Sequence, residues 1–252
     1  MLHLRRKDAP FAVIDSHAGR GAYDLAGAGA ARTNEAANGI GKLSGIEADG
    51  GLGEYLWLAR GRAQYPGSPL LAAQLLRPQD RLVAVEKHPE EFAALKTVLA
   101  PFRNARAEEA DGYHRLTALL PPAERRGLIV IDPPFEAANE FQVLGQAIAA
   151  ALRRFATGIY LVWYPHKSAP EVNALCGDAL NAGARKALRI DLDLGAGGAP
   201  IGTKTPLTAT GVLVINPPYG FADDMRAALA TVAPRLSQTA TFRIDWIAGE
   251  PD

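Results

Sequence analysis

Leu128-Ile129-Val130-Ile131-Asp132-Pro133-Pro134-Phe135 is the most informative stretch of this chain. Its four apolar, mostly β-branched residues predict a buried strand of the kind found in parallel sheets. The two prolines must end that strand, because they lack N–H donors and have a fixed φ. In an open α/β sheet, ligands bind at the carboxyl ends of the strands. The break therefore displays a carboxylate, proline carbonyls and an aromatic ring together.

This cluster suits a planar group that carries an exocyclic amine. Asp132 and the carbonyl of Pro133 can accept N–H bonds from the amine, while Phe135 stacks on the ring. The plainer interpretation is a strand that ends in a Pro-Pro turn with a solvated aspartate. Taken alone, these eight residues leave both interpretations open.

Working outward, apolar runs and helical stretches alternate along the chain. Strand-like runs occur at residues 11–14, 81–85, 158–162, 186–192, 211–215 and 239–247, and a weaker run leads into Asp111. Segments 68–76, 90–99, 136–155, 173–181 and 222–236 favour helices. This alternation predicts an α/β fold with a doubly wound, mostly parallel sheet. Seven strands in this order match the Rossmann-like sheet of class I methyltransferases.

The domain prediction is a single domain over residues 1–252, with an insertion at residues 27–66. The insertion is rich in Gly, Ala and small polar residues, so we expect short helices or poor order there. A composition of 48% hydrophobic and 21% charged residues fits a globular protein. The formal net charge of zero neither requires nor excludes a nucleic-acid partner.

The cysteine content and the lengths of the apolar runs also indicate the cellular compartment. The single cysteine, Cys176, rules out an intrachain disulfide and gives no metal-binding pattern. No apolar run approaches the roughly 20 residues of a membrane span, and the start lacks a signal-peptide pattern. We therefore expect a cytoplasmic protein without metal or membrane, and a monomer.

Three further strand ends carry the residues that a methyl-donor site needs. Asp15-Ser16-His17-Ala18-Gly19-Arg20-Gly21 follows the first strand, Glu86 ends the second, and Asp111-Gly112 follows the third. Glycines let the backbone approach the methionine part of S-adenosylmethionine. An acid after strand two accepts ribose hydroxyls, and one after strand three can accept from the adenine amine. With Asp132, this ordered set is a specific signal.

His17 and Ser68 each have two interpretations. A lone histidine beside a tight turn is usually structural, but its place inside this loop favours cofactor contact over a role as catalytic base. Ser68 can cap a helix whose first residue is Pro69, and the same helix start could receive a cofactor carboxylate. Capping and ligand binding can coexist.

A second motif, Asn216-Pro217-Pro218-Tyr219, competes for the catalytic role. Catalytic Asp/Asn-Pro-Pro-aromatic motifs follow the fourth strand, whereas Asn216 follows the seventh. We expect it mainly to terminate the sheet near the pocket, with a smaller part for Tyr219 in substrate contact.

The chain resembles the bacterial 23S ribosomal RNA adenine-N6 methyltransferases of the large-subunit methyltransferase J family, from about Lys7 to Trp246. The resemblance rests on residues 15–19, 65–69, 111–112, 125–134, 155–160, 163–165 and 215–218. It implies cofactor contacts at His17, Ser68, Glu86, Asp111, Gly112 and Asp132, and a catalytic Asp132. Members of the family carry a further segment before the position of Met1, so either the start lies upstream or part of the pocket wall is missing here.

The resulting expectation is methylation of adenine N6 in 23S ribosomal RNA. Asp132, Pro133 and Phe135 bind the flipped base, and Gly19 joins the cofactor contacts. Phosphate contacts are expected among Arg32, Arg125, Arg126, Arg153, Arg154 and Lys204, with loop 202–209 ordering on RNA. A guanine-N2 RNA methyltransferase and a cofactor-binding RNA module with little activity stay open. A protein glutamine methyltransferase and a dehydrogenase fit less well.

Overall fold

The computed structural model describes residues 1–25, 35–60, 64–195 and 207–249. Arg32, Lys204, most of loop 202–209 and parts of the predicted insertion lie outside these ranges. No helix within the described ranges is long and apolar enough to cross a membrane.

Eight strands form the main sheet, in the order β10-β8-β9-β7-β6-β1-β4-β5. Their bounds are β1 Ala12–Asp15, β4 Arg81–Glu86, β5 Ala105–Glu109, β6 Gly127–Ile131, β7 Ile159–Pro165, β8 Ala187–Asp193, β9 Ala209–Ile215 and β10 Thr241–Ala248. The five strands from β7 to β5 are parallel. β9 runs antiparallel to both β7 and β8, and β10 pairs antiparallel with β8. The expected seven strands are thus extended by one, because the C-terminal run adds an edge strand.

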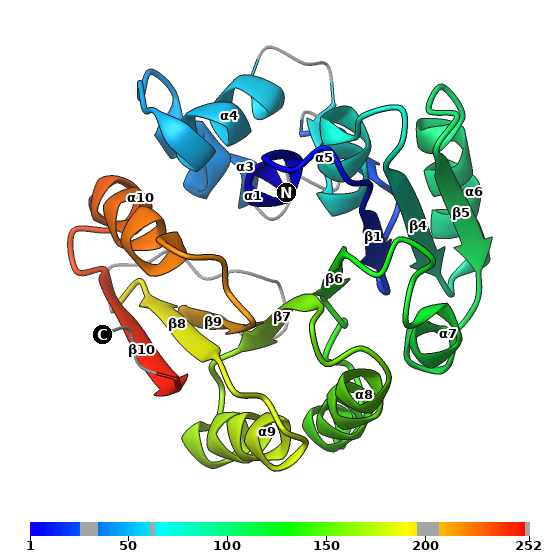
Figure 1. The fold of residues 1–252 in the computed structure, drawn as a ribbon. Helices are drawn as coiled ribbons and strands as arrows, with labels where there is room; N and C mark the ends of the chain where they lie inside the picture. The colour runs from blue at the N-terminus through cyan, green and yellow to red at the C-terminus, as the bar shows by residue number, and fades with distance from the viewer. Residues whose placement is uncertain (26–34, 61–63, 196–206, 250–252) are drawn as a thin grey trace.

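Helices cover both faces of this sheet (Figure 1). They are α1 Leu2–Arg5, α5 Ser68–Leu75, α6 Pro89–Leu99, α7 Gly112–Leu119, α8 Glu140–Arg154, α9 Ala169–Asn181 and α10 Phe221–Leu236. One core packs α7, α8 and α9 against Ile129, Ile131, Tyr160 and Val162. A second packs α1, α5 and α6 on the other face, and α10 covers β8 and β9 there.

Two helices differ from the sequence-based expectation. The predicted helix at 136–155 begins only at Glu140, because the chain after β6 first passes through an irregular loop. α7 was not expected; it has only eight residues, and its start is fixed by a side-chain cap from Asp111 rather than by an apolar pattern.

Short elements occupy the described part of the predicted insertion. β2 Ala22–Tyr23 pairs antiparallel with β3 Tyr65–Pro66. Between them lie α3 Glu35–Asn38, the 3-10 helix η1 Ile40–Leu43 and α4 Gly50–Ala59. Leu43, Ile46 and Leu56 form a small core that also contacts α10. The expected short helices are confirmed for these residues.

Candidate active site

The strand order brings the predicted acids to one edge of the sheet, which we call the site edge. β1 lies between β4 and β6, and all three run parallel. Asp15 and Glu86 therefore end neighbouring strands, and Asp132 follows the end of β6. The chain leaves β1 toward β4 on one side and later returns to β6 on the other. Such a switch point is where open α/β sheets bind ligands.

Asp15 is the most unusual acid of this edge. It is 0% exposed, and neither carboxylate oxygen has a hydrogen-bond partner of normal geometry among the described residues. Burial raises the pKa of Asp15 to about 7; the nearby Ser68 hydroxyl opposes this shift, and the charge of Asp132 adds to it. A buried carboxylate without full hydrogen bonding is costly, so Asp15 is a candidate for interaction with a positively charged ligand.

Glu86 holds the glycine turn that follows β1. Its two carboxylate oxygens accept the backbone N–H of Gly19 at 2.9 Å and of His88 at 2.7 Å. Gly19 has a φ of +59°, a conformation that glycine adopts without strain. Each carboxylate oxygen keeps a free lone pair, so Glu86 can still accept hydroxyl donors from a ligand.

Asp111 and Gly112 form the start of α7. One oxygen of Asp111 accepts the backbone N–H groups of Tyr113 and His114, and the other accepts Lys87 Nζ at 3.0 Å. Burial opposes the charge of Asp111, but these bonds outweigh it and lower the pKa. A Cβ on Gly112 would lie 2.0 Å from the carbonyl oxygen of Ser16, so only glycine fits against the turn after β1.

His17 is a neutral side chain in this site. Desolvation lowers the pKa of His17 to about 4, although nearby acids oppose the shift. Its Nδ1 lies 2.9 Å from Ser16 Oγ, and Ser16 Oγ donates to the carbonyl of Val130. Since the hydroxyl proton points at Val130, the hydrogen between Ser16 and His17 belongs to Nδ1. Nε2 is then left as a hydrogen-bond acceptor.

Ser68 is not the cap of α5, contrary to the expectation from sequence. The N-cap is Gly67, Ser68 is the first helical residue, and Pro69 is the second. Helix starts are hard to fix from sequence within a residue or two. The Ser68 hydroxyl is exposed and acts on the pKa of Asp15, so it does belong to the site edge.

The loop between β6 and α8 carries the Asp-Pro-Pro-Phe motif. Asp132 is exposed to solvent on one side, and desolvation by the surrounding atoms raises its pKa to about 6, while Pro133 is buried. Phe135 has a φ of +50°, which is rare for a bulky residue. Its ring packs against Phe141 and Trp163, with centroid distances of 4.8 and 5.8 Å. The strained backbone thus holds a half-buried aromatic ring close to Asp132.

The second proline motif lies at the other side of the sheet, which corrects the expectation that it lies near the pocket. β9 is antiparallel to β7, with Ile215 paired to Tyr160, so its carboxyl end reaches the edge where the parallel strands begin. We call this the opposite edge. The Asn216 amide donates to the carbonyls of Ala156 and Gly158 at 2.8 and 2.7 Å. Asn216 therefore ties the sheet to the α8–β7 connection.

The predicted arginine pairs also lie toward the opposite edge. Arg125 and Arg126 directly precede β6, and Arg153 and Arg154 end α8. Arg126 donates to the carbonyls of Leu4 and Ala9, and Arg154 donates to that of Leu120. These contacts support a structural role for Arg126 and Arg154.

Some residues of the site edge were missed from sequence. The sequence indicates Asp15 only as part of a glycine-rich loop, and Trp163 only as part of the resemblance to the methyltransferase family. Tyr113 and Glu140 were given no role. Their pairing depends on tertiary contacts, so no local spacing signals it; only the position of Glu140 just after the proline motif offers a hint.

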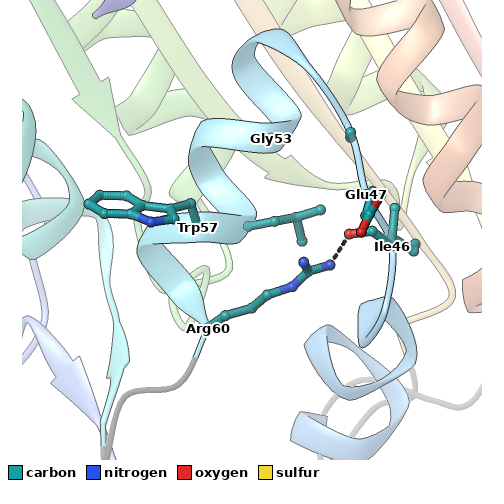
Figure 2. Close-up of a pocket in the computed structure, with 7 residues that line it drawn as sticks. Ile46, Glu47, Gly53, Trp57 and Arg60 are labelled. Atoms are coloured by element: carbon teal, nitrogen blue, oxygen red, sulfur yellow. Dashed lines mark hydrogen bonds between the residues drawn. The ribbon is translucent and has the colours of Figure 1, made fainter.

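Two described hollows lie away from these residues. One, of about 380 Å³, lies between α4 and residues 46–48, beside the 70% exposed Trp57. Figure 2 shows Arg60 bonded to the carbonyl of Ile46 in this hollow. A larger hollow, of about 760 Å³, is bounded by α1, α4, α10 and the apolar sheet face. Neither is lined by the acids of the site edge.

The arrangement defines a class of protein. Dehydrogenases with a dinucleotide fold have a doubly wound sheet built from parallel strands. Here an antiparallel strand, β9, is inserted between β7 and β8 at one end of the parallel set. That sheet, together with acids after successive strands, is the one of class I methyltransferases. The dehydrogenase alternative is thereby wrong.

Comparison with known proteins narrows the class to a family. The family model described as ribosomal RNA large subunit methyltransferase D, RlmJ, matches residues 8–248. The chain is 37% identical over 256 residues to ribosomal RNA large subunit methyltransferase J of Escherichia coli (strain K12), with coverage of 98% and 90% of the two chains. The protein of the same name from Haemophilus influenzae is 32% identical over 258 residues, with the same coverage. The chain belongs to this family of methyltransferases.

A solved structure supports the fold along nearly the whole chain. The crystal structure of a protein from Legionella pneumophila str. Philadelphia 1 is 31% identical and superposes with a TM-score of 0.86. The likeness covers 97% of this chain and 91% of the other.

Proposed function

We propose that this protein transfers a methyl group from S-adenosylmethionine to N6 of an adenine in 23S ribosomal RNA. The observation that carries the proposal is the placement of Asp132 and Phe135 on one loop at the site edge, in a chain of this family. The relatives' names specify large-subunit ribosomal RNA. Adenine N6 is argued from the chemistry of the loop. A cytoplasmic location follows from that substrate.

The charges of the site edge fit this cofactor. Asp15, Glu86 and Asp132 converge there, while Lys87 and Arg20 are paired with Asp111 and Glu91. S-adenosylmethionine supplies a methyl group on a positively charged sulfonium, and it also bears an ammonium and two ribose hydroxyls. A cluster of acids whose charges are not fully paired within the protein suits a ligand of that charge.

The residues that would hold the cofactor are His17, Gly19, Ser68, Glu86, Asp111, Gly112 and Asp132. Glu86 accepts the ribose hydroxyls and Asp111 faces the adenine end. The buried Asp15, beside the helix start at Ser68, would attract the ammonium through its charge. The small Gly112 leaves room where α7 meets the turn after β1.

The substrate loop supplies what a weakly nucleophilic amine needs. The lone pair of an exocyclic amine is delocalised into its ring. Hydrogen bonds from N6 to Asp132 and to the Pro133 carbonyl direct that lone pair toward the methyl group, and alignment at a near-attack distance of about 3–3.5 Å lowers the barrier. The methylated nitrogen is acidic, so Asp132 need not be a strong base. Stacking on Phe135 offsets part of the cost of unstacking the base.

The direct test is nucleoside mass spectrometry of unmodified 23S ribosomal RNA after incubation with the protein and S-adenosylmethionine. We expect N6-methyladenosine, and we expect it to vanish with Asp132→Ala. Calorimetric titration with the cofactor shows whether the variant still binds it. N2-methylguanosine in place of N6-methyladenosine would move the protein to the guanine-modifying class. Cofactor binding without any product would favour a binding module.

A further inference from the structure

We propose that Tyr113 and Glu140 form a latch that positions the Asp132–Phe135 loop against the cofactor site. Both are positioning residues: neither is assigned to touch the reacting atoms. The inference rests on the proposed function for the identity of the substrate. Its structural part can be tested without any activity.

Glu140 is the centre of the latch. It is the first residue of α8 and only 8% exposed, although it carries a carboxylate. One oxygen accepts the hydroxyl of Tyr113 at 2.7 Å, and the other accepts the backbone N–H of Ala137 at 3.3 Å. A buried carboxylate persists when its oxygens find donors, and here the donors come from two different segments.

Tyr113 connects this carboxylate to the cofactor side. It is the second residue of α7, directly after Gly112, and its backbone N–H is held by the Asp111 cap. Burial and the bond to Glu140 raise the pKa of Tyr113, so the hydroxyl stays protonated and keeps donating. The rings of Tyr113 and His17 meet in an edge-to-face arrangement with a centroid distance of 4.6 Å.

These contacts form a continuous path from the end of β6 to the start of α8. It runs from the carbonyl of Val130 through Ser16 and His17 to the ring of Tyr113, and from there to Glu140. Glu140 then returns to the substrate loop at Ala137. The path begins just before Asp132 and ends just after Phe135. It therefore fixes both ends of the loop relative to the turn after β1.

The loop needs such support because of its own backbone. Phe135 has a φ of +50° and is half buried, so the loop adopts a conformation that isolated chain disfavours. Ring contacts to Phe141 and Trp163 hold the Phe135 side chain. These ring contacts do not hold the backbone between Phe135 and α8, which is held by the bond from the Ala137 N–H to Glu140. Without the latch, we expect Asp132 and Phe135 to sample non-productive positions.

Tyr113→Phe removes one hydroxyl and keeps the ring beside His17. We expect the amides of residues 135–139, above all that of Ala137, to exchange hydrogen several times faster in the free protein, with α7 unchanged. With RNA, we expect kcat/KM to fall about 10- to 100-fold, as for a misplaced reacting group, while the dissociation constant of S-adenosylmethionine stays within about threefold. Glu140→Gln should act in the same direction, because its amide cannot accept the Ala137 N–H and the Tyr113 hydroxyl together.

Tyr160→Phe is the matched control. The Tyr160 hydroxyl is buried and donates to the carbonyls of Ala151 and Phe155, at the start of β7 near the opposite edge. Its loss should lower stability without changing exchange at 135–139 or the kinetics with RNA. Unchanged exchange in Tyr113→Phe would overturn the latch. So would wild-type kinetics despite faster exchange, or a loss of cofactor affinity as large as the loss of kcat/KM. If the wild-type protein methylates no RNA, the proposed function fails while the exchange result still decides the latch.

Discussion

Asp80 and Asp15 are two equally buried acids at opposite edges of the sheet, and their surroundings differ. Asp80, just before β4 at the opposite edge, accepts the backbone N–H groups of Phe11 and Arg77 and two bonds from the Arg77 guanidinium. Burial opposes its charge, but these donors outweigh it and lower the pKa of Asp80. Asp15, equally buried at the site edge, has no donor of normal geometry among the described residues, and burial raises its pKa. The hydrogen bonds of Asp80 are completed within the fold, whereas those of Asp15 are not, and we relate this difference to the ligand proposed for the site edge.

The two proline motifs repeat this contrast. Both contain a residue with positive φ, Phe135 at +50° and Asn216 at +54°. The Asn216 amide is occupied by two carbonyls, and Tyr219 is 98% exposed with no ring partner among the described residues. Asp132 accepts no hydrogen bond from the described residues, while Phe135 packs among aromatic rings. The direction of the preceding strand, rather than the motif, separates their roles.

Substituting the polar residue of each proline motif should give the largest difference in activity between the two motifs. Asp132→Asn removes the charge with little change of shape, and we expect kcat to fall about 100- to 1,000-fold because the acceptor for N6 is weakened and partly replaced by donors. Stability should hardly change. Asn216→Ala should leave kcat within about twofold and lower the free energy of unfolding by about 1–3 kcal/mol, because two carbonyls lose their donor. Methylation assays and chemical unfolding measure the two; comparable losses of kcat in both variants would break the contrast.

Sequence could predict most of the sheet, for a physical reason. Strands buried on both faces read as continuous apolar runs, and residues 128–131 and 82–85 do so. The polar residue after each run then marks the site edge. Strand direction is different, because it depends on connections and partners. The residues of β9 themselves carry no sign that it is antiparallel, so Asn216 was placed near the wrong edge.

The rest of the site depends on contacts between distant segments. The unpartnered state of Asp15 is a property of its whole surroundings. The pairing of Tyr113 with Glu140 joins helices that are separated by the β6 strand. Phe135 could be predicted as a stacking residue, but its neighbour Trp163 lies in β7 and meets it only in the folded chain.

Truncating the aromatic residue of each proline motif should give an effect on activity of intermediate size, which sharpens the comparison. Phe135→Ala removes the proposed stacking surface, which is worth about 1–3 kcal/mol per base, so we expect kcat/KM for RNA to fall roughly 10- to 100-fold. Phe135→Leu keeps apolar volume without a ring and should recover only a small part. Tyr219→Ala should behave as wild type. Steady-state kinetics with a fixed, saturating cofactor concentration measure all three, and equal losses at positions 135 and 219 would contradict the assignment of the site edge.

The smallest expected effect is the pH dependence that Asp15 adds to cofactor binding. The pKa of Asp15 is raised to about 7, so below that pH the free protein must release a proton before Asp15 can pair with an ammonium. Affinity for S-adenosylmethionine should therefore rise as the pH increases from 6 to 7, by about three- to tenfold. The cofactor ammonium stays largely protonated there, since α-amino groups have a pKa of about 7.7–8.0.

Asp132, with a pKa of about 6, also lies at the site edge and contributes the part of the rise in affinity near pH 6. Glu86 and the neutral His17 lie at the same edge. Asp15→Asn should bind more weakly and lose the dependence near pH 7, while the part near pH 6 remains. Calorimetry in two buffers of different ionisation enthalpy would show proton release by the wild type and less by the variant. The Asp80→Asn variant, altered at the opposite edge, should lose stability and keep the wild-type pH dependence of binding, because its carboxylate is already paired within the protein. An Asp15→Asn protein with an unchanged binding profile would show that the missing donor at Asp15 is not supplied by the cofactor.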